Sequence, residues 1–255
     1  MTKKKKVMSQ GRIWIGTSNV VVPGNKTSFP PEFRDASRLH YYSTLFNSVE
    51  INSSFYKVPL QNTFSRWSDD VVNDFRFSVK MHKEFTHTKN LLADHDLIDP
   101  FLQATTGLGE KKGALLVQFP GKITLDYFDK VESLLDRLKN SSFISGWTPV
   151  VEFRSPTWYI RETTELLDYN GASLVLQDLP KSKWQERVTR SPVVYMRFHG
   201  PEGGYRGSYG MGFLKKQAEE IVNWKSEGRE VFVYFNNTIG NAFENALSLK
   251  AMVEG

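Results

Sequence analysis

The chain has 255 residues, of which 40% are hydrophobic and 13% aromatic, and it contains no cysteine. This composition is typical of a packed globular protein and excludes a disordered chain, a disulfide scaffold and a cysteine-ligated metal site. No apolar run approaches the roughly 18 residues that a membrane span needs, and no hydrophobic signal-peptide segment follows the N-terminal lysines. We therefore expect a cytoplasmic protein without a membrane partner.

The net charge of +5 is concentrated at one end of the chain. Lys3 to Lys6 carry four of these positive charges, so the rest of the chain is close to neutral. We expect residues 1–11 to form a basic, disordered tail. Residues 12–255 should form one domain, because a chain of this length suits a single large core.

Eight short apolar or β-branched runs, each ending at polar or turn-forming residues, predict eight strands. In chain order they are Ile13–Ile15, Ser48–Ile51, Phe75–Val79, Ala114–Phe119, Pro149–Val151, Ser173–Leu176, Val193–Met196 and Val231–Phe235.

Apolar residues three and four positions apart predict helices between these strands. The clearest helix extends from Leu125 to Leu138, with Thr124 as its expected N-cap. Others extend from Leu39 to Leu45, from Leu214 to Val222 and from Ala242 to Val253. The segment around Trp184, between the sixth and seventh strands, has no helical pattern.

Eight strands alternating with helices predict an α/β fold, a single-domain TIM (β/α)8-type barrel with a weak or missing helix after strand six. A doubly wound open sheet is the alternative, and it would require a glycine-rich dinucleotide loop after the first strand. Gly16-Thr-Ser-Asn19 does not match that fingerprint.

Polar and ionisable residues follow nearly every predicted strand. They include Glu50, Asn52, Lys80, His87, Glu152, Arg154, Asp178, Arg197, His199, Asn236 and Asn237. In a barrel the carboxyl ends of the strands meet at one mouth, and residues two apart on a strand share a face. We expect Glu152 and Arg154 to point into this mouth and Phe153 to face the helices. The alternative is a set of structural ion pairs that fill the top of the barrel.

These residue types can support acid–base chemistry. Glu50 or Glu152 would act as the general base and His199 or Lys80 as the acid, with Asp178 as a fifth catalytic candidate.

Binding groups accompany them. Arg154 and Arg197 would clamp an anion, and the further binding candidates are Asn52, His87, Asn236 and Asn237. We therefore expect an enzyme of the isomerase, lyase or hydrolase type that acts on a small phosphorylated or carboxylated, sugar-like molecule. The loop from Gly200 to Gly212 contains six glycines and could serve as a lid.

Three alternatives remain open. Glu50, Glu152, Asp178 and His199 are ligand types for a divalent metal, but no HxH or HExxH spacing supports one and no cofactor is assigned. A nucleic-acid-binding or phosphodiester-cleaving barrel would use the basic tail, the arginines and four aromatic residues, namely Trp14, Tyr56, Trp158 and Tyr205. A non-enzymatic scaffold is the third.

The strand ends also carry a family resemblance. The segments that carry it are IGTS, YYSTLFNSVEINSSFY, FRFSVKMHKEFTH, GALLVQFP, VVEFRSPTW, QDLP, VYMRFHG and VYFNNTIGNAFENA. In this order, from about Ile13 to about Ala246, they resemble the YecE-like family, known as domain of unknown function number 72. The resemblance implies a TIM barrel, loosely akin to sugar-isomerase and endonuclease-IV-like barrels, and implies no established reaction. The chain departs from the family pattern after GTS, where Asn19-Val-Val-Val-Pro23 replaces an aromatic run.

Overall fold

The computed structural model describes residues 11–255. The expected tail therefore lies outside the described residues except for Gly11, which is buried and donates its backbone N–H to the Lys225 carbonyl at 3.1 Å. A Cβ at position 11 would lie 1.9 Å from the Arg229 carbonyl oxygen. Gly11 thus packs closely against the chain at Lys225 and Arg229.

The strands form two sheets in which all neighbours are parallel. The four-stranded sheet has the order β1 (Ile13–Thr17), β9 (Glu230–Phe235), β8 (Val193–Phe198) and β7 (Leu176–Gln177). The five-stranded sheet has the order β2 (Ser48–Ile51), β3 (Arg76–Lys80), β4 (Lys112–Phe119), β5 (Thr148–Phe153) and β6 (Ser173–Leu174).

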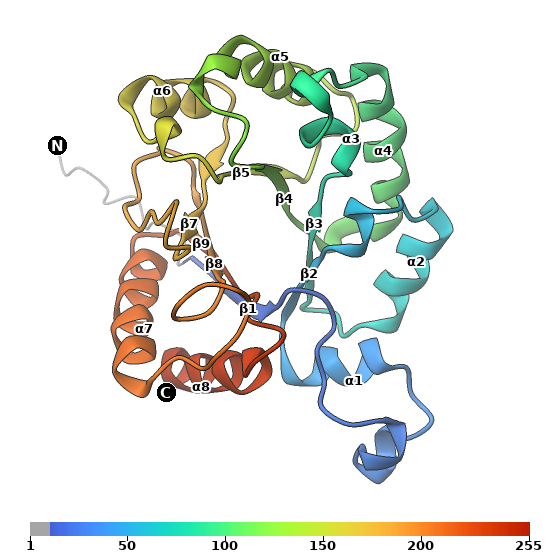
Figure 1. Ribbon diagram of the computed structural model, residues 1–255. Coiled ribbons are helices and arrows are strands. Elements are labelled where there is room, and N and C mark those ends of the chain that lie inside the picture. Colours follow the sequence, from blue (N-terminus) through green and yellow to red (C-terminus); the bar gives the residue numbers. More distant parts are fainter. Residues whose placement is uncertain (1–10) are drawn as a thin grey trace, which may run out of the picture.

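Two contacts link the two sheets. A parallel bridge between Ser18 and Glu50 connects the end of β1 to β2. On the other side only Val175 separates β6 from β7, and its N–H bonds to the Val151 carbonyl at 2.9 Å. The strands surround a common centre and the helices lie outside them (Figure 1). This α/β arrangement is consistent with a TIM-like barrel.

Eight α-helices connect or follow the strands in the described part of the chain. They are α1 (Arg38–Leu45), α2 (Gln61–Asp70), α3 (Lys83–Thr86), α4 (Ile98–Thr105), α5 (Phe128–Lys139), α6 (Arg161–Tyr169), α7 (Met211–Ser226) and α8 (Ala242–Glu254). Between β7 and β8 there is no helix, and Trp184 instead pairs antiparallel with Gln177. The missing helix after strand six is therefore confirmed.

Thr124 occupies the expected N-cap position, but its hydroxyl donates to the Asp126 carboxylate at 2.9 Å and accepts no backbone N–H. Residues Leu125–Tyr127 form a 3-10 turn ahead of α5, and the Leu125 N–H is satisfied by the Thr157 hydroxyl.

Side-chain alternation divides the apolar core into two layers. An inner cluster inside the strands includes Trp14, Leu116, Val150, Tyr195 and Phe232. The larger outer cluster packs the other strand faces against the helices. No helix within residues 11–255 has both the length and the apolar character needed to span a membrane.

Candidate functional site

The inner face of the strands changes from apolar to charged towards their carboxyl ends. On β5, Val150 belongs to the inner cluster and Glu152 lies two residues further along the same face. On β8, Tyr195 is followed in the same way by Arg197 and then by His199 just beyond the strand. Residues two apart on a strand share a face. The inward positions that hold apolar core residues in the middle of each strand therefore hold charged residues at its carboxyl end.

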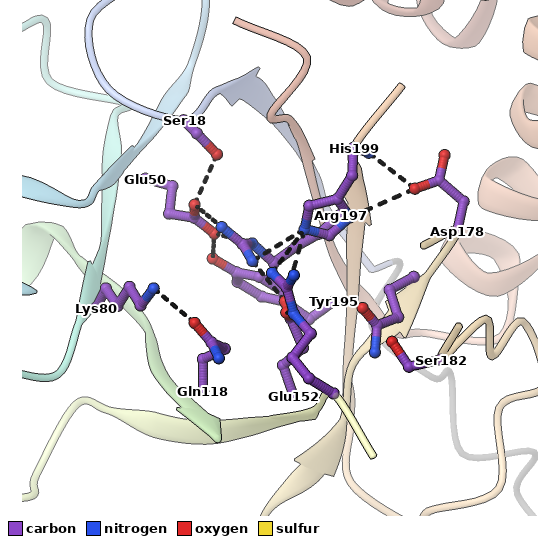
Figure 2. A network of polar contacts seen from close by, with 12 residues as sticks. Ser18, Glu50, Lys80, Gln118, Glu152, Asp178, Ser182, Tyr195, Arg197 and His199 are labelled. Carbon is purple, nitrogen blue, oxygen red and sulfur yellow. Dashed lines mark hydrogen bonds and ion pairs between the residues drawn. The ribbon is translucent and has the colours of Figure 1, made fainter. Parts of the chain in front are cut away.

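Arg197 is the centre of a buried ion-pair network (Figure 2). Its Nε and Nη2 atoms donate to the two oxygens of Glu50, each at 2.8 Å, and its Nη1 atom donates to Glu152. Burial alone would raise the pKa of both carboxyl groups, but the neighbouring guanidinium groups hold both pKa values below their usual range. Both glutamates are therefore ionised at neutral pH.

Glu50 is also saturated with neutral donors. The Ser18 and Tyr195 hydroxyls donate to it at 2.7 Å each, and the Asn52 side-chain amide donates at 2.9 Å. With the two bonds from Arg197, the two carboxylate oxygens of Glu50 accept five hydrogen bonds. Such a carboxylate is well suited to orient an arginine and poorly suited to take up a proton.

His199 is neutral in this setting. Its Nε2 atom lies 3.2 Å from nitrogen atoms of both Arg154 and Arg197, and guanidinium groups can only donate. The ring proton therefore belongs on Nδ1, which faces Asp178 at 3.4 Å. Burial lowers the pKa of His199, in agreement with a neutral ring. Asp178 in turn accepts the His199 backbone N–H at 2.8 Å and the Tyr209 hydroxyl.

A cavity of about 230 Å³ opens beside the network; we call it the polar cavity. Its charged lining consists of Lys80, Arg154 and Arg197. The remaining lining residues are neutral amides and aromatic rings, namely Asn19, Asn52, Gln118, Asn236, Phe55, Tyr56 and Tyr205. No aspartate or glutamate of residues 11–255 lines it, because the carboxylates that pair with Arg154 and Arg197 lie behind the wall. The cavity surface itself therefore presents cations and no anion.

Lys80 is the least compensated of the three cations. Its Nζ atom donates to the Gln118 amide oxygen at 2.8 Å, and the two residues face each other beside the network in Figure 2. The Phe55 ring centroid lies 4.1 Å from Nζ. Burial and then the charge of Arg197 lower the pKa of Lys80 to about 8. Among the described residues, no ion pair joins Lys80 to a carboxylate.

A second cavity of about 590 Å³, which we call the outer cavity, adjoins the first. Gln118, Arg154 and Tyr205 line both cavities, and Arg154 Nη1 lies 3.4 Å from the Tyr205 hydroxyl at their boundary. Pro120, Leu179 and Pro180 give the outer cavity apolar walls. Tyr205 has a φ of 63°, a left-handed backbone that costs free energy in a residue other than glycine.

The expected site residues occupy several positions. Lys80, Arg154, Arg197, Asn52 and Asn236 line the polar cavity. His87 lines the outer cavity, where burial lowers its pKa to about 4. Glu50, Glu152 and His199 lie behind the cavity in the buried network, and Asp178 lies beside them. Asn237 is fully buried and bonds to Gly207 and Asn245, away from both cavities.

Sequence reasoning did not assign some cavity residues to the anion site. Asn19 lies in a loop that carries no periodic signal, and Tyr56 was expected only as a stacking residue for nucleic acid. Tyr195, which donates to Glu50, could have been found because it precedes Arg197 by two residues on the same strand face. Gln118 is a polar residue near the end of its strand, and alternation along β4 turns it inward to the cavity.

The geometry gives little support to the alternative metal site and to the set of nucleic-acid stacking residues. Within residues 11–255 no three histidine, aspartate or glutamate side chains are grouped to hold a metal ion, so the four candidate ligands do not form such a group. Of the four stacking candidates, Trp14 and Trp158 are buried, whereas Tyr56 and Tyr205 are exposed at the polar cavity.

The residues after β5 turn away from the site. Trp158 stacks on Phe153 under the helices with ring centroids 4.3 Å apart. Ser155 precedes the 3-10 helix Pro156–Trp158, and α6 begins at Arg161. Phe153 faces the outer cluster, as expected.

The chain is similar to several proteins. The model of a family described as "Protein of unknown function DUF72" matches residues 14–255. UPF0759 protein YunF of Bacillus subtilis strain 168 is 23% identical over 258 aligned positions, which cover 89% of this chain and 90% of YunF. UPF0759 protein YecE of Escherichia coli K12 is 28% identical over 127 positions, which cover 50% of this chain and 45% of YecE.

Two solved structures share the fold. A DUF72 family protein from Enterococcus faecalis V583 superposes with a TM-score of 0.77 at 21% identity, covering 96% of this chain and 98% of that one. A DUF72 family protein from Thermotoga maritima MSB8 superposes with a TM-score of 0.73 at 26% identity, covering 95% of this chain and 99% of that one.

Proposed function

The chain belongs to the DUF72 family of proteins of unknown function, and on that premise we propose that its polar cavity binds a small anionic molecule on which the protein acts as an enzyme. The observation that carries the proposal is the charge of the lining, which has three cations and, among the described residues, no acid. Phosphate or carboxylate groups are the natural partners of such a lining, because arginine offers two parallel donors to their oxygens.

We infer that the two sheets are parts of one (β/α)8 barrel whose sixth strand is interrupted at Val175. The Ser18–Glu50 bridge and the Val175–Val151 hydrogen bond support closure at the two seams. In such a barrel the polar cavity lies at the carboxyl ends of the strands, where barrel enzymes do their chemistry.

Within this proposal the buried glutamates orient the arginines. Glu50 and Glu152 hold Arg197 from two sides, and Glu152 also holds Arg154. Such rigid guanidinium groups bind an anion without first losing conformational freedom. Lys80, with a pKa of about 8, is the lining group best suited to exchange a proton near neutral pH.

The outer cavity offers room for the rest of the molecule. Its apolar walls adjoin the cationic lining at Arg154, so a substrate with an anionic head and a less polar body fits both parts. The loop with Tyr205, which contacts Arg154, would close over such a substrate.

Arg154→Gln tests the anion site. Arg154 is mostly buried, with 17% of its side chain exposed, and it lines both cavities. Loss of one charge-assisted hydrogen bond should weaken sulfate and sugar-phosphate binding by about 10-fold to 100-fold in calorimetric titrations. Arg161→Gln is the matched control, because Arg161 is 87% exposed on α6. Equal sulfate affinity in both variants and the parent protein would count against the proposal.

Soaking crystals with sulfate and with sugar phosphates locates the anion independently. We expect density between Lys80, Arg154 and Arg197. A mouth that stays empty at high ligand concentration would contradict the anion site. A steep loss of nucleic-acid affinity between low and physiological salt would instead favour a nucleic-acid-binding protein.

A further inference from the structure

The position of Lys80 suits a nucleophile as well as a cationic binding group. It ends β3 and lines the polar cavity, and the hydrogen-bond partner of its amine is the neutral Gln118 amide oxygen. A lysine held by a carboxylate stays protonated, whereas one beside other cations and an apolar surface gives up its proton more readily.

We propose that Lys80 forms an imine with the carbonyl carbon of a small substrate that also bears a carboxylate or phosphate group. This inference rests on the proposed anion site and names its substrate class. It assigns a covalent step to Lys80, in addition to its place in the cationic lining.

The surroundings of the amine favour this reaction. Arg154 and Arg197 line the same cavity of about 230 Å³, so an anionic group bound by them leaves an adjacent carbonyl within the small space that Lys80 also lines. The Phe55 ring, 4.1 Å from Nζ, covers one side of the amine with apolar surface. Burial and the nearby arginines increase the population of the uncharged amine. With a pKa of about 8, roughly a tenth of it is unprotonated at pH 7.

The step balances without an oxidant or reductant. The Nζ lone pair attacks the carbonyl carbon, and the π electrons move to the oxygen, which takes one proton from the nitrogen to give a carbinolamine. The hydroxyl then leaves as water with the second nitrogen proton, and the nitrogen lone pair forms the C=N bond. Protonation of the imine by solvent gives the iminium form, which withdraws electrons from the neighbouring carbon.

Borohydride trapping tests the proposal. The full chain is incubated separately with pyruvate, with dihydroxyacetone phosphate and with acetone as an uncharged comparison, and is then reduced with sodium borohydride. Intact mass measurement should show one reduced adduct per chain with an anionic carbonyl compound, and peptide mapping should place it on Lys80. Excess sulfate should suppress the adduct, and acetone should give far less of it.

Two variants make the result specific. Lys80→Arg keeps the positive charge but cannot form the imine, so the adduct should vanish while sulfate binding persists. Lys57→Arg alters an exposed lysine that lines neither cavity, and the adduct should remain. An adduct that is spread over many lysines, or that survives in Lys80→Arg, would overturn the proposal.

The result also separates the two proposals. Sulfate binding without any adduct would support the anion site and contradict imine formation at Lys80. The absence of both sulfate binding and adduct would contradict both proposals.

Discussion

At the scale of single residues, Glu152 differs most from its expected role. The sequence suggested a general base, whereas the structure places this residue in a buried ion-pair network. It is fully buried and paired with both Arg154 and Arg197. Glu152→Gln would leave that positive charge partly unpaired, so the free energy of unfolding should fall by about 3–5 kcal/mol. Because the cavity gains net positive charge, sulfate binding by the folded variant should tighten. Urea unfolding and calorimetry measure the two effects.

Glu165→Gln is the control for this substitution. Glu165 pairs with Arg161 on the surface of α6, and such pairs contribute about 1 kcal/mol or less. A stability of Glu152→Gln equal to that of Glu165→Gln, combined with a loss of ligand binding, would favour a catalytic carboxylate instead.

The pKa of Lys80 predicts a pH dependence. Its folded-state value of about 8 is below its ordinary value of 10.5, so the amine loses its charge as the pH rises through about 8. Sulfate, whose own charge is constant there, should bind more weakly above pH 8. Between pH 8 and 10.5 the unfolded chain holds more protons at this residue, so its contribution to stability rises with pH.

Lys80→Arg is the comparison for the pH series. Arginine stays charged throughout this range, so the variant should bind sulfate with an affinity that changes little from pH 7 to 9.5. Parallel titration curves for parent and variant would show that another group controls the pH dependence.

At the scale of elements, the contact between β1 and β2 depends on Gly16. A Cβ at this position would lie 1.9 Å from the Ser48 carbonyl oxygen and 2.6 Å from the Tyr42 hydroxyl. Gly16→Ala should therefore force the two strands apart and lower the melting temperature sharply. The matched control is Gly212→Ala in the first turn of α7, where the new Cβ meets no atom within 4 Å. It should be neutral or stabilise by up to about 1 kcal/mol. Equal melting temperatures of the two variants would contradict this explanation.

The strands were easier to predict than the helices for identifiable reasons. Parallel strands that are covered on both faces appear as short apolar runs, and each of the eight predicted runs overlaps an observed strand. The sixth run is divided into β6 and β7 at Val175, because the residues before it pair with β5 and those after it pair with β8. Helices were expected between these strands, but the sequence did not define the bounds of α4, because Pro100 in its first turn suggests a break, although proline is tolerated there. It did not define those of α2, because this helix buries only Phe64.

At the scale of the whole molecule, the sequence predicted which charges gather but not how they pair. The alternation of residues along each strand and the rule that parallel strands point the same way bring Glu50, Glu152 and Arg197 to one end. Which carboxylate each arginine meets depends on the position of β8 relative to β2 and β5. That position follows from the twist and register of both sheets, which are set by contacts far apart in sequence.

The ion pairs of Arg197 also limit the order in which substitutions can accumulate in this sequence during evolution. Its partners are on β2 and β5, in the other sheet, and Glu50 is 147 positions away in the chain. A lineage that replaced the arginine first would bury two carboxylates without a counter-charge, and few proteins have the stability to survive that intermediate. Lineages that acquire a new ligand should therefore vary neutral lining residues such as Gln118 and Asn236, and inherit Glu50, Glu152 and Arg197 together.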